Sequence, residues 1–209
     1  MRALTSACLL IAASALAAPA HAQTYTNSPT MGDIDGRQGP WGIEMRVGRS
    51  ATTQNFSGED LDYGLGFEFR GTYRLNRVLG LYAGASIDLF DANKDFTGRD
   101  NALADLGYIA GLTVDGNFGA SRVGWRLHGG ANYGEIKVYE DDNDSNVGAT
   151  GHKLGWELGA AITIALPNKW ELSPGITYRS RSATLRLNGV DRDADLEYYR
   201  LGIGFGRRF

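Results

Sequence analysis

Apolar and polar residues alternate along most of the chain beyond residue 40. In each alternating stretch, apolar side chains occupy every second position, and glycine, polar or charged residues lie between them. This two-residue period predicts β-strands, because successive side chains of a strand point to opposite faces. We place eight strands at residues 41–48, 65–70, 81–89, 106–114, 123–133, 154–164, 170–179 and 199–209.

The segments between the strands have turn or loop composition, and short and long connections alternate. Beyond residue 22, no apolar stretch is long enough for a transmembrane helix. A strand can cross lipid only in a closed barrel, which pairs every backbone group. The pattern therefore predicts an all-β fold, a closed antiparallel eight-stranded transmembrane β-barrel. An even number of strands places both termini on the side of the short turns, which is the periplasm in this class.

Asn188-Gly189 is a strong signal for a two-residue hairpin between the last two strands. A turn there pairs Leu172 with Phe205 and Tyr178 with Tyr199, so that both apolar faces coincide. A register shifted by one residue would place them on opposite faces. The paired strands are longer than a bilayer requires, and we expect this hairpin to project from the outer surface as a β-ribbon.

The N-terminus is typical of an export signal. Met1-Arg2 precedes an apolar run over residues 3–18, and Pro-Ala-His-Ala ends at Ala22 in the small-x-small form of a cleavage site. We predict a cleaved signal peptide at residues 1–22, a periplasmic lead at 23–39 and an outer-membrane barrel at 40–209. Cys8 lies inside the signal, so the mature chain has no cysteine for a disulfide or a thiolate site.

Charged residues fall on the predicted inner face in equal numbers of each sign. The interior of an eight-stranded barrel is about wide enough for side chains, and a buried charge is retained only when it is paired. The sequence predicts a plugged interior, in which inward glycines leave space for the arginines; a gated polar pathway is the alternative. The candidate ion-pair residues are Glu44, Arg46, Glu68, Arg70, Asp88, Arg126, Glu157, Glu171, Arg179 and Arg200.

Candidate chemistry is sparse. His128 is assigned to the inner face and His152 to a loop margin, and neither belongs to a convincing catalytic set. Asp142-x-Asp144 begins like a calcium loop, but Val147 and Lys153 stand where that loop needs glycine and glutamate. We expect no enzyme activity, no cofactor and no metal site. The formal net charge of −3 gives no basis for nucleic-acid binding.

The last strand ends with apolar residues of one parity and a terminal phenylalanine. This end resembles the targeting signal of bacterial outer-membrane barrels, and Arg207 departs from that pattern. The candidate signal residues are Tyr199, Leu201, Ile203, Phe205 and Phe209.

With the signal peptide and the eight strands, the mature chain resembles the small outer-membrane β-barrel family that includes outer membrane protein X and the barrel of outer membrane protein A. The resemblance implies a Gram-negative outer membrane, insertion by the barrel assembly machinery, contact with membrane lipids and lipopolysaccharide, and outer loops available to a surface ligand. A closed barrel has no free edge and is expected to be a monomer.

Three functions remain open from the sequence. The leading hypothesis is a structural or surface-interaction barrel without catalysis. The alternative is a narrow channel or transporter for small solutes, and the third is a lipid A-modifying enzyme.

Overall fold

A computed structural model describes residues 40–53, 63–92, 101–119, 121–140, 145–187 and 190–209. The predicted signal peptide and lead, residues 1–22 and 23–39, lie outside these ranges. The strands are β1 (Trp41–Thr52), β2 (Gly64–Arg74), β3 (Leu79–Ala92), β4 (Asn101–Asn117), β5 (Val123–Glu140), β6 (Ser145–Ala149), β7 (Lys153–Ala165), β8 (Trp170–Leu187) and β9 (Val190–Arg208), with a 3-10 turn, η2 (Pro167–Lys169), before β8.

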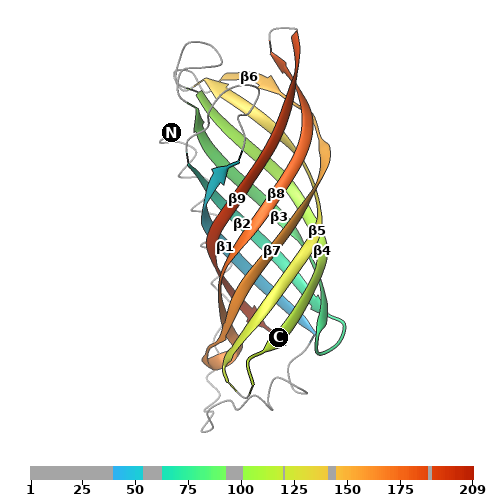
Figure 1. Ribbon diagram of the computed structural model, residues 1–209, viewed down its shortest axis with the longest axis vertical. Coiled ribbons are helices and arrows are strands. Elements are labelled where there is room, and N and C mark those ends of the chain that lie inside the picture. Colours follow the sequence, from blue (N-terminus) through green and yellow to red (C-terminus); the bar gives the residue numbers. More distant parts are fainter. Residues whose placement is uncertain (1–39, 54–62, 93–100, 120, 141–144, 188–189) are drawn as a thin grey trace.

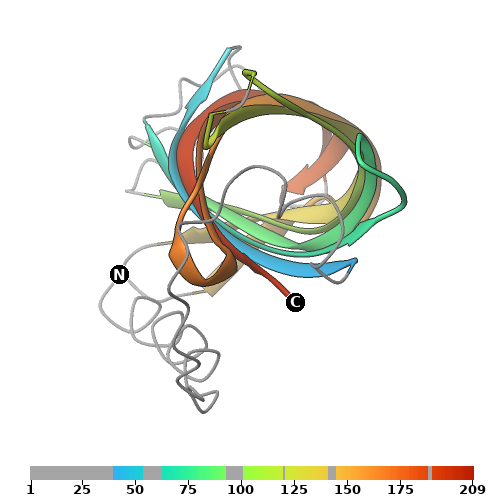
Figure 2. The same ribbon diagram turned by 90° about the horizontal axis from the view of Figure 1, so that it is seen from below.

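The strands form one closed antiparallel barrel (Figures 1 and 2). Each long strand pairs with its neighbours in sequence order, and β1 closes the ring by pairing with β9. The short β6 pairs with β5 and β8 above the end of β7, across an irregularity between Val138 and Tyr139. It extends the sixth barrel strand, so the predicted eight-stranded closed barrel is confirmed.

The register of β8 and β9 agrees with the hairpin prediction. Leu172 lies opposite Phe205 and Tyr178 lies opposite Tyr199, and the pairing continues to Leu187 opposite Val190. The turn residues 188–189 themselves lie outside the described ranges. In Figure 1 this hairpin reaches furthest at one end of the barrel.

The two ends of the barrel differ. The end that we call the turn end has short connections at residues 75–78, 118–122 and 166–169. Both ends of the barrel sequence meet there, because the backbone N–H of Phe209 donates to the carbonyl of Trp41 at 2.9 Å. The opposite end, which we call the loop end, contains β6 and the tip of β8 and β9.

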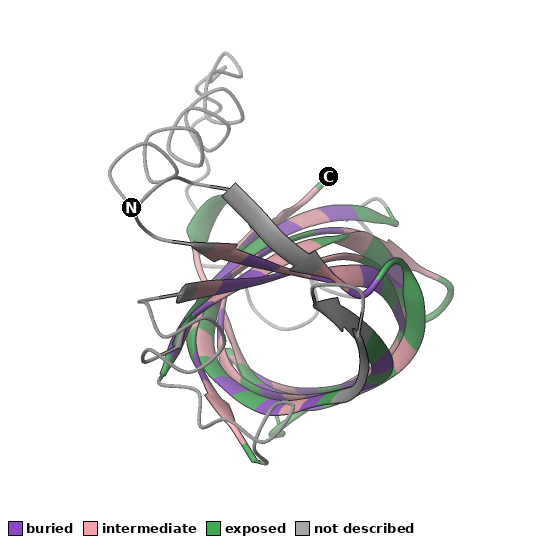
Figure 3. Cartoon of the chain, turned by 90° about the horizontal axis from the view of Figure 1, so that it is seen from above, coloured by how far each residue is buried: buried purple, intermediate pink, exposed green. Residues whose placement is uncertain are grey.

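The side chains alternate between the two faces of the wall, as Figure 3 shows by its bands of buried and exposed residues. Large apolar side chains such as Leu201 and Leu158 are exposed on the outside, at 69% and 58%. Charged side chains such as Arg70 and Asp88 are buried inside, at 1% and 0%. This arrangement suits a barrel whose outer surface contacts lipid. Among the described residues, no helix is long and apolar enough to cross a membrane.

Candidate functional site: the barrel interior

The barrel interior contains most of the buried charge of the described chain. Four buried carboxylates and four buried arginines form what we call the central cluster. Its members are Glu68, Asp88, Asp105, Glu157, Arg70, Arg179, Arg181 and Arg200. They come from six strands, β2, β3 and β4 on one wall of the barrel and β7, β8 and β9 on the other.

 A further strand, β5, contributes no charged member, but its Asn132 accepts hydrogen bonds from Arg181 at 2.9 and 2.8 Å.

Glu68 is the carboxylate with the most arginine partners in this cluster. It pairs with Arg70 on its own strand, with Arg179 at 2.5 Å and with Arg200 at 3.0 Å. Arg200 and Arg179 also contact Asp88, at 2.6 and 3.3 Å. Arg179 and Arg200 therefore each lie between carboxylates of different strands, and these ion pairs connect opposite walls of the barrel.

Glu157 joins the same cluster from β7. Its carboxylate accepts from the Tyr82 hydroxyl at 2.6 Å, from Arg179 at 2.8 Å and from Arg70 at 3.3 Å. The Arg70 guanidinium also lies over the Tyr82 ring, 4.5 Å from its centroid. A buried carboxylate with three donors has its hydrogen-bonding needs met, as retention of a charge in a dry interior requires.

Two cluster residues were missed from the sequence, Asp105 and Arg181. They pair with each other at 2.5 Å, and the hydroxyl of Tyr198 lies 3.0 Å from Asp105 and 2.8 Å from Asp88. The predicted fourth strand begins at Leu106, one residue after Asp105, and the predicted seventh strand ends at Arg179, two residues before Arg181. Continuing the alternation of β8 from Arg179 by two residues would have found Arg181.

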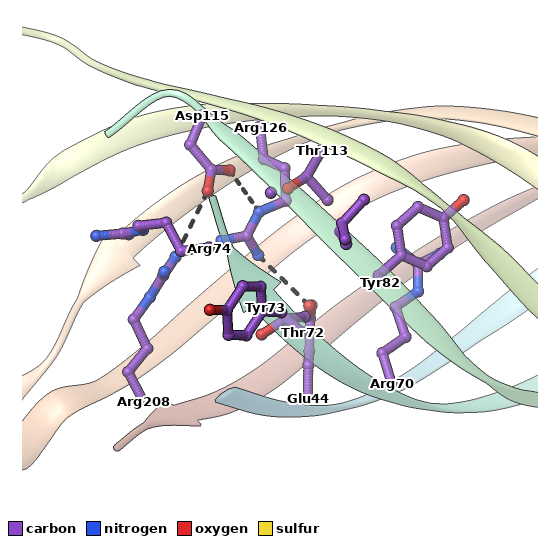
Figure 4. A pocket seen from close by; sticks show the side chains of 12 residues that line it. Glu44, Arg70, Thr72, Tyr73, Arg74, Tyr82, Thr113, Asp115, Arg126 and Arg208 are labelled. Atoms are coloured by element: carbon purple, nitrogen blue, oxygen red, sulfur yellow. Dashed lines mark hydrogen bonds and ion pairs between the residues drawn. The ribbon is translucent and has the colours of Figure 1, made fainter. Parts of the chain in front are cut away.

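A second group of charges lies toward the turn end, and Figure 4 shows four of its side chains, Glu44, Asp115, Arg126 and Arg208. Arg126 contacts Asp115 at 2.7 Å, Glu171 at 2.9 Å and Glu44 at 3.4 Å, and Arg46 contacts Glu44 at 3.0 Å. Arg208 reaches Glu171 at 3.4 Å and Asp115 at 3.6 Å. The cavity beside these residues has a volume of about 20 Å³, which is room for about one water molecule.

All ten predicted interior residues therefore lie inside the barrel wall, in two neighbouring groups. Glu44, Arg46, Arg126 and Glu171 belong to the turn-end group, and the other six belong to the central cluster. Two further residues of this group, Asp115 and Arg208, were not among the predicted interior residues. Asp115 directly follows the predicted fourth strand, and Arg208 lies in the predicted last strand.

Above the central cluster, the interior becomes apolar toward the loop end. We call this layer the apolar cap, and its side chains are between 0% and 2% exposed: Phe90, Leu103, Ile136, Val138 and Leu196. The Phe90 ring contacts the ring of Tyr198 edge-on, with 5.3 Å between centroids. The cap thus lies directly beside the uppermost polar residues of the cluster. The alternation of the sequence did not predict this layer, because the predicted third and fifth strands end before these residues and the predicted fourth begins after Leu103.

Inward glycines make room for the large side chains of the interior. Gly111 and Gly130 lie opposite each other on β4 and β5. A Cβ on Gly111 would lie 2.8 Å from the Tyr82 ring, and one on Gly130 would lie 2.6 Å from the Tyr82 hydroxyl and closer still to the Ala110 carbonyl. The pair therefore forms the space in which Tyr82 reaches Glu157.

We expect Gly130→Ala to prevent correct folding, because the methyl group would meet both backbone and Tyr82. Gly129→Ala is the matched control, since its Cβ would be no closer than 3.4 Å to Leu158 on the outer face. Heat-modifiable mobility of the refolded variants measures the difference. Equal folding of the two variants would contradict the role given to this glycine pair.

The histidines have separate environments. His128 is 2% exposed, and its Nε2 lies 3.3 Å from both Arg70 and Thr177. His152 is on the outside near the loop end, where its Nδ1 lies 3.9 Å from Glu135. Glu135 also accepts from Lys137 at 2.6 Å, and this hydrogen bond raises the pKa of Lys137. In the described part of the chain, no group of three or more His, Cys, Asp or Glu side chains could hold a metal ion.

The sequence matches the family described as outer membrane protein beta-barrel domain over residues 8–209. The chain therefore belongs to this family of outer-membrane β-barrels, and it is an integral protein of the Gram-negative outer membrane. It has no significant match among curated protein sequences.

Solved structures support the fold. The chain is similar to Neisserial surface protein A, with a TM-score of 0.56 and 14% identity over 83% of this chain and 100% of that one. It is also similar to the outer membrane protein OprG from Pseudomonas aeruginosa, with a TM-score of 0.54 and 13% identity over 82% and 97% of the two chains. The chain is similar as well to outer membrane protein AlkL, with a TM-score of 0.52 and 16% identity over 90% of this chain and 96% of that one. At these identities the likeness concerns the fold alone.

Proposed function

We propose that the protein is a sealed outer-membrane barrel that acts through its outer surface, in a structural or surface-interaction role. The observation that supports this most directly is the filled interior. The central cluster connects opposite walls through paired charges, and the apolar cap lies between that cluster and the loop end. Ions would have to break several buried pairs and cross an apolar layer to pass.

The proposed orientation places the turn end in the periplasm, because barrels of this class have short periplasmic turns and longer outer loops. The mature chain would begin at Gln23 after removal of residues 1–22. The terminal residues Tyr199, Leu201, Ile203, Phe205 and Phe209 would serve as the signal read by the barrel assembly machinery. Outer-leaflet lipopolysaccharide and a ligand of the outer loops are the expected contacts on the other side.

Single-channel recording of the mature protein tests the sealed interior. Refolded residues 23–209 in a planar bilayer should give no persistent unitary conductance, after heat-modifiable mobility has confirmed folding. Discrete current steps that change with Glu157→Ala or Arg126→Ala would instead establish the narrow channel. Those two substitutions are informative because each removes a residue with at least three interior contacts.

The proposal gives the barrel no catalytic role. His128 is inside the wall, where Arg70 and Thr177 occupy its Nε2. His152 and Glu135 are the pair that could face outer-leaflet lipid. Mass spectrometry of lipid A from cells that overproduce the protein should show unchanged acylation, and altered acylation lost in His152→Ala would establish the enzyme hypothesis instead.

A further inference from the structure

Arg207 is a charged residue on the apolar outer face of the barrel. Its strand neighbours of the same parity are Phe205 and Phe209, and it lies opposite Ile43 on β1 and Trp170 on β8. Every one of these neighbours is apolar or aromatic. The sequence pattern of the last strand has a cation at a position where lipid-facing strands carry an apolar residue.

Among the described residues, two aromatic rings and no carboxylate lie against this cation. The Arg207 guanidinium carbon lies 5.4 Å from the centroid of the Trp170 ring and 5.6 Å from that of Phe209. Within the described residues, its side chain has no ion pair, and its buried Nε has no hydrogen-bond partner. The adjacent Arg208 differs, since it points inward and reaches both Glu171 and Asp115.

A partly buried guanidinium without an anion is costly unless another molecule provides one. The two aromatic faces attract the cation but leave its N–H groups without acceptors. A guanidinium presents paired N–H donors that match two oxygens of a phosphate group. The chemistry of the site therefore calls for a phosphate that approaches from the lipid side.

The depth of Arg207 in the membrane selects the kind of phosphate. Trp170, Trp41 and Tyr73 lie at the same end of the barrel, with Trp41 packed on Tyr73 at 4.7 Å between centroids. Tryptophan and tyrosine collect where lipid headgroups meet the hydrocarbon. In the proposed orientation, this end contacts the periplasmic leaflet, whose headgroup phosphates lie at that level.

We propose that Arg207, held between Trp170 and Phe209, binds the phosphodiester of a glycerophospholipid in the periplasmic leaflet. The bound lipid headgroup supplies the anion that no described residue provides. This site fixes the depth of the last strand in the membrane and accounts for a cation within its terminal pattern. The proposal depends on the orientation given above but not on whether the interior conducts.

Solid-state NMR measures the contact directly. The folded barrel, labelled with ¹³C and ¹⁵N in arginine, is reconstituted in bilayers of phosphatidylethanolamine and phosphatidylglycerol, and ³¹P dephasing of the assigned Arg207 guanidinium is recorded. We expect strong dephasing of this signal. Weak dephasing of Arg207, equal to that of the interior Arg179, would overturn the proposal.

Two comparisons make the test specific. The ³¹P dephasing summed over all arginine guanidinium signals should fall in Arg207→Gln and be retained in Arg122→Gln. Arg122→Gln is the matched control, because it removes one exposed arginine from a turn at the same end of the barrel. In bilayers of a phosphate-free glycolipid, the Arg207 signal should show no dephasing even when inorganic phosphate is added. Dephasing by inorganic phosphate alone would show a site for the free anion and would overturn the assignment to lipid.

The orientation on which the proposal depends has its own test. Protease added to intact cells should cleave an epitope inserted at residues 188–189 and should spare one inserted in the turn at 118–122. The reverse result would reject the periplasmic leaflet while leaving the Arg207–phosphate contact measurable.

Discussion

Replacing Glu68 with alanine is expected to lower the free energy of unfolding by about 3–5 kcal/mol, the cost of removing one partner from a buried ion pair. Glu68 contacts Arg70, Arg179 and Arg200, and its side chain is 1% exposed. The substitution leaves these guanidinium groups with fewer carboxylates in an interior that water enters poorly. Urea unfolding in lipid vesicles, followed by tryptophan fluorescence, measures the change.

Glu135→Ala is the matched control for this measurement. It also removes a glutamate that pairs with a cation, Lys137, but on the outside, where the side chains are 20% and 27% exposed. Exposed pairs of this kind contribute about 0–1 kcal/mol. A double-mutant cycle of Glu68→Ala with Arg200→Met should show favourable coupling, because Arg200→Met removes one of the stranded charges. A stability of Glu68→Ala equal to that of the control would contradict the paired-interior account.

The sequence was sufficient for the fold because strands in a lipid-facing barrel follow a strict two-residue period. The hairpin at residues 188–189 had two independent signals, the turn residues and the matching apolar faces of Leu172 and Phe205. Their agreement determined the register that the structure has. Strand ends were harder to predict, because β4 and β5 continue beyond the apolar outer surface that marks the lipid-facing part.

Beyond that surface, the rule for reading the two faces changes. In the lipid-facing part, outward residues are apolar and inward residues are polar. Near the loop end, Ile136 and Val138 face inward, and Glu135 and Lys137 face outward. A pattern search that expects apolar residues outside therefore ends the strand at Tyr133 and misses the apolar cap. The reversal itself, where outward residues become charged and inward ones apolar, is the signal that could have located it.

The pairing within the interior could not be predicted from the sequence for a different reason. Strand parity places Glu68 and Arg179 inside, but the period gives no distance between residues on opposite walls. Which carboxylate meets which arginine depends on the tilt and stagger of all eight strands. In addition, a long and flexible arginine side chain can reach several different carboxylates from one position in a strand. The same holds on the outer face. The sequence places Arg207 on that face, but it does not predict the contact of its guanidinium with two aromatic rings.

Phe90→Ala is expected to destabilise the barrel by about 3–5 kcal/mol, as truncation of a buried phenylalanine does in other cores. Phe90 is 1% exposed and packs on Tyr198, which in turn contacts Asp88. Its removal opens the apolar cap directly above the central cluster. Unfolding in urea measures the loss of stability, with Leu201→Ala on the lipid-facing surface as the control.

The same substitution tests whether the cap keeps water from the ion pairs. Residues 23–209, the predicted mature chain, contain no cysteine. In this chain Ser50→Cys provides a single thiol beneath the cap, because Ser50 is fully buried and donates to Asp88 at 2.7 Å. A charged thiol reagent added from outside should leave this position unmodified, and it should react when Phe90→Ala is also present. Leu201→Ala should leave the protection unchanged. Equal rates of thiol modification with phenylalanine and with alanine at position 90 would show that the cap does not seal the interior. The central cluster alone would then have to exclude ions.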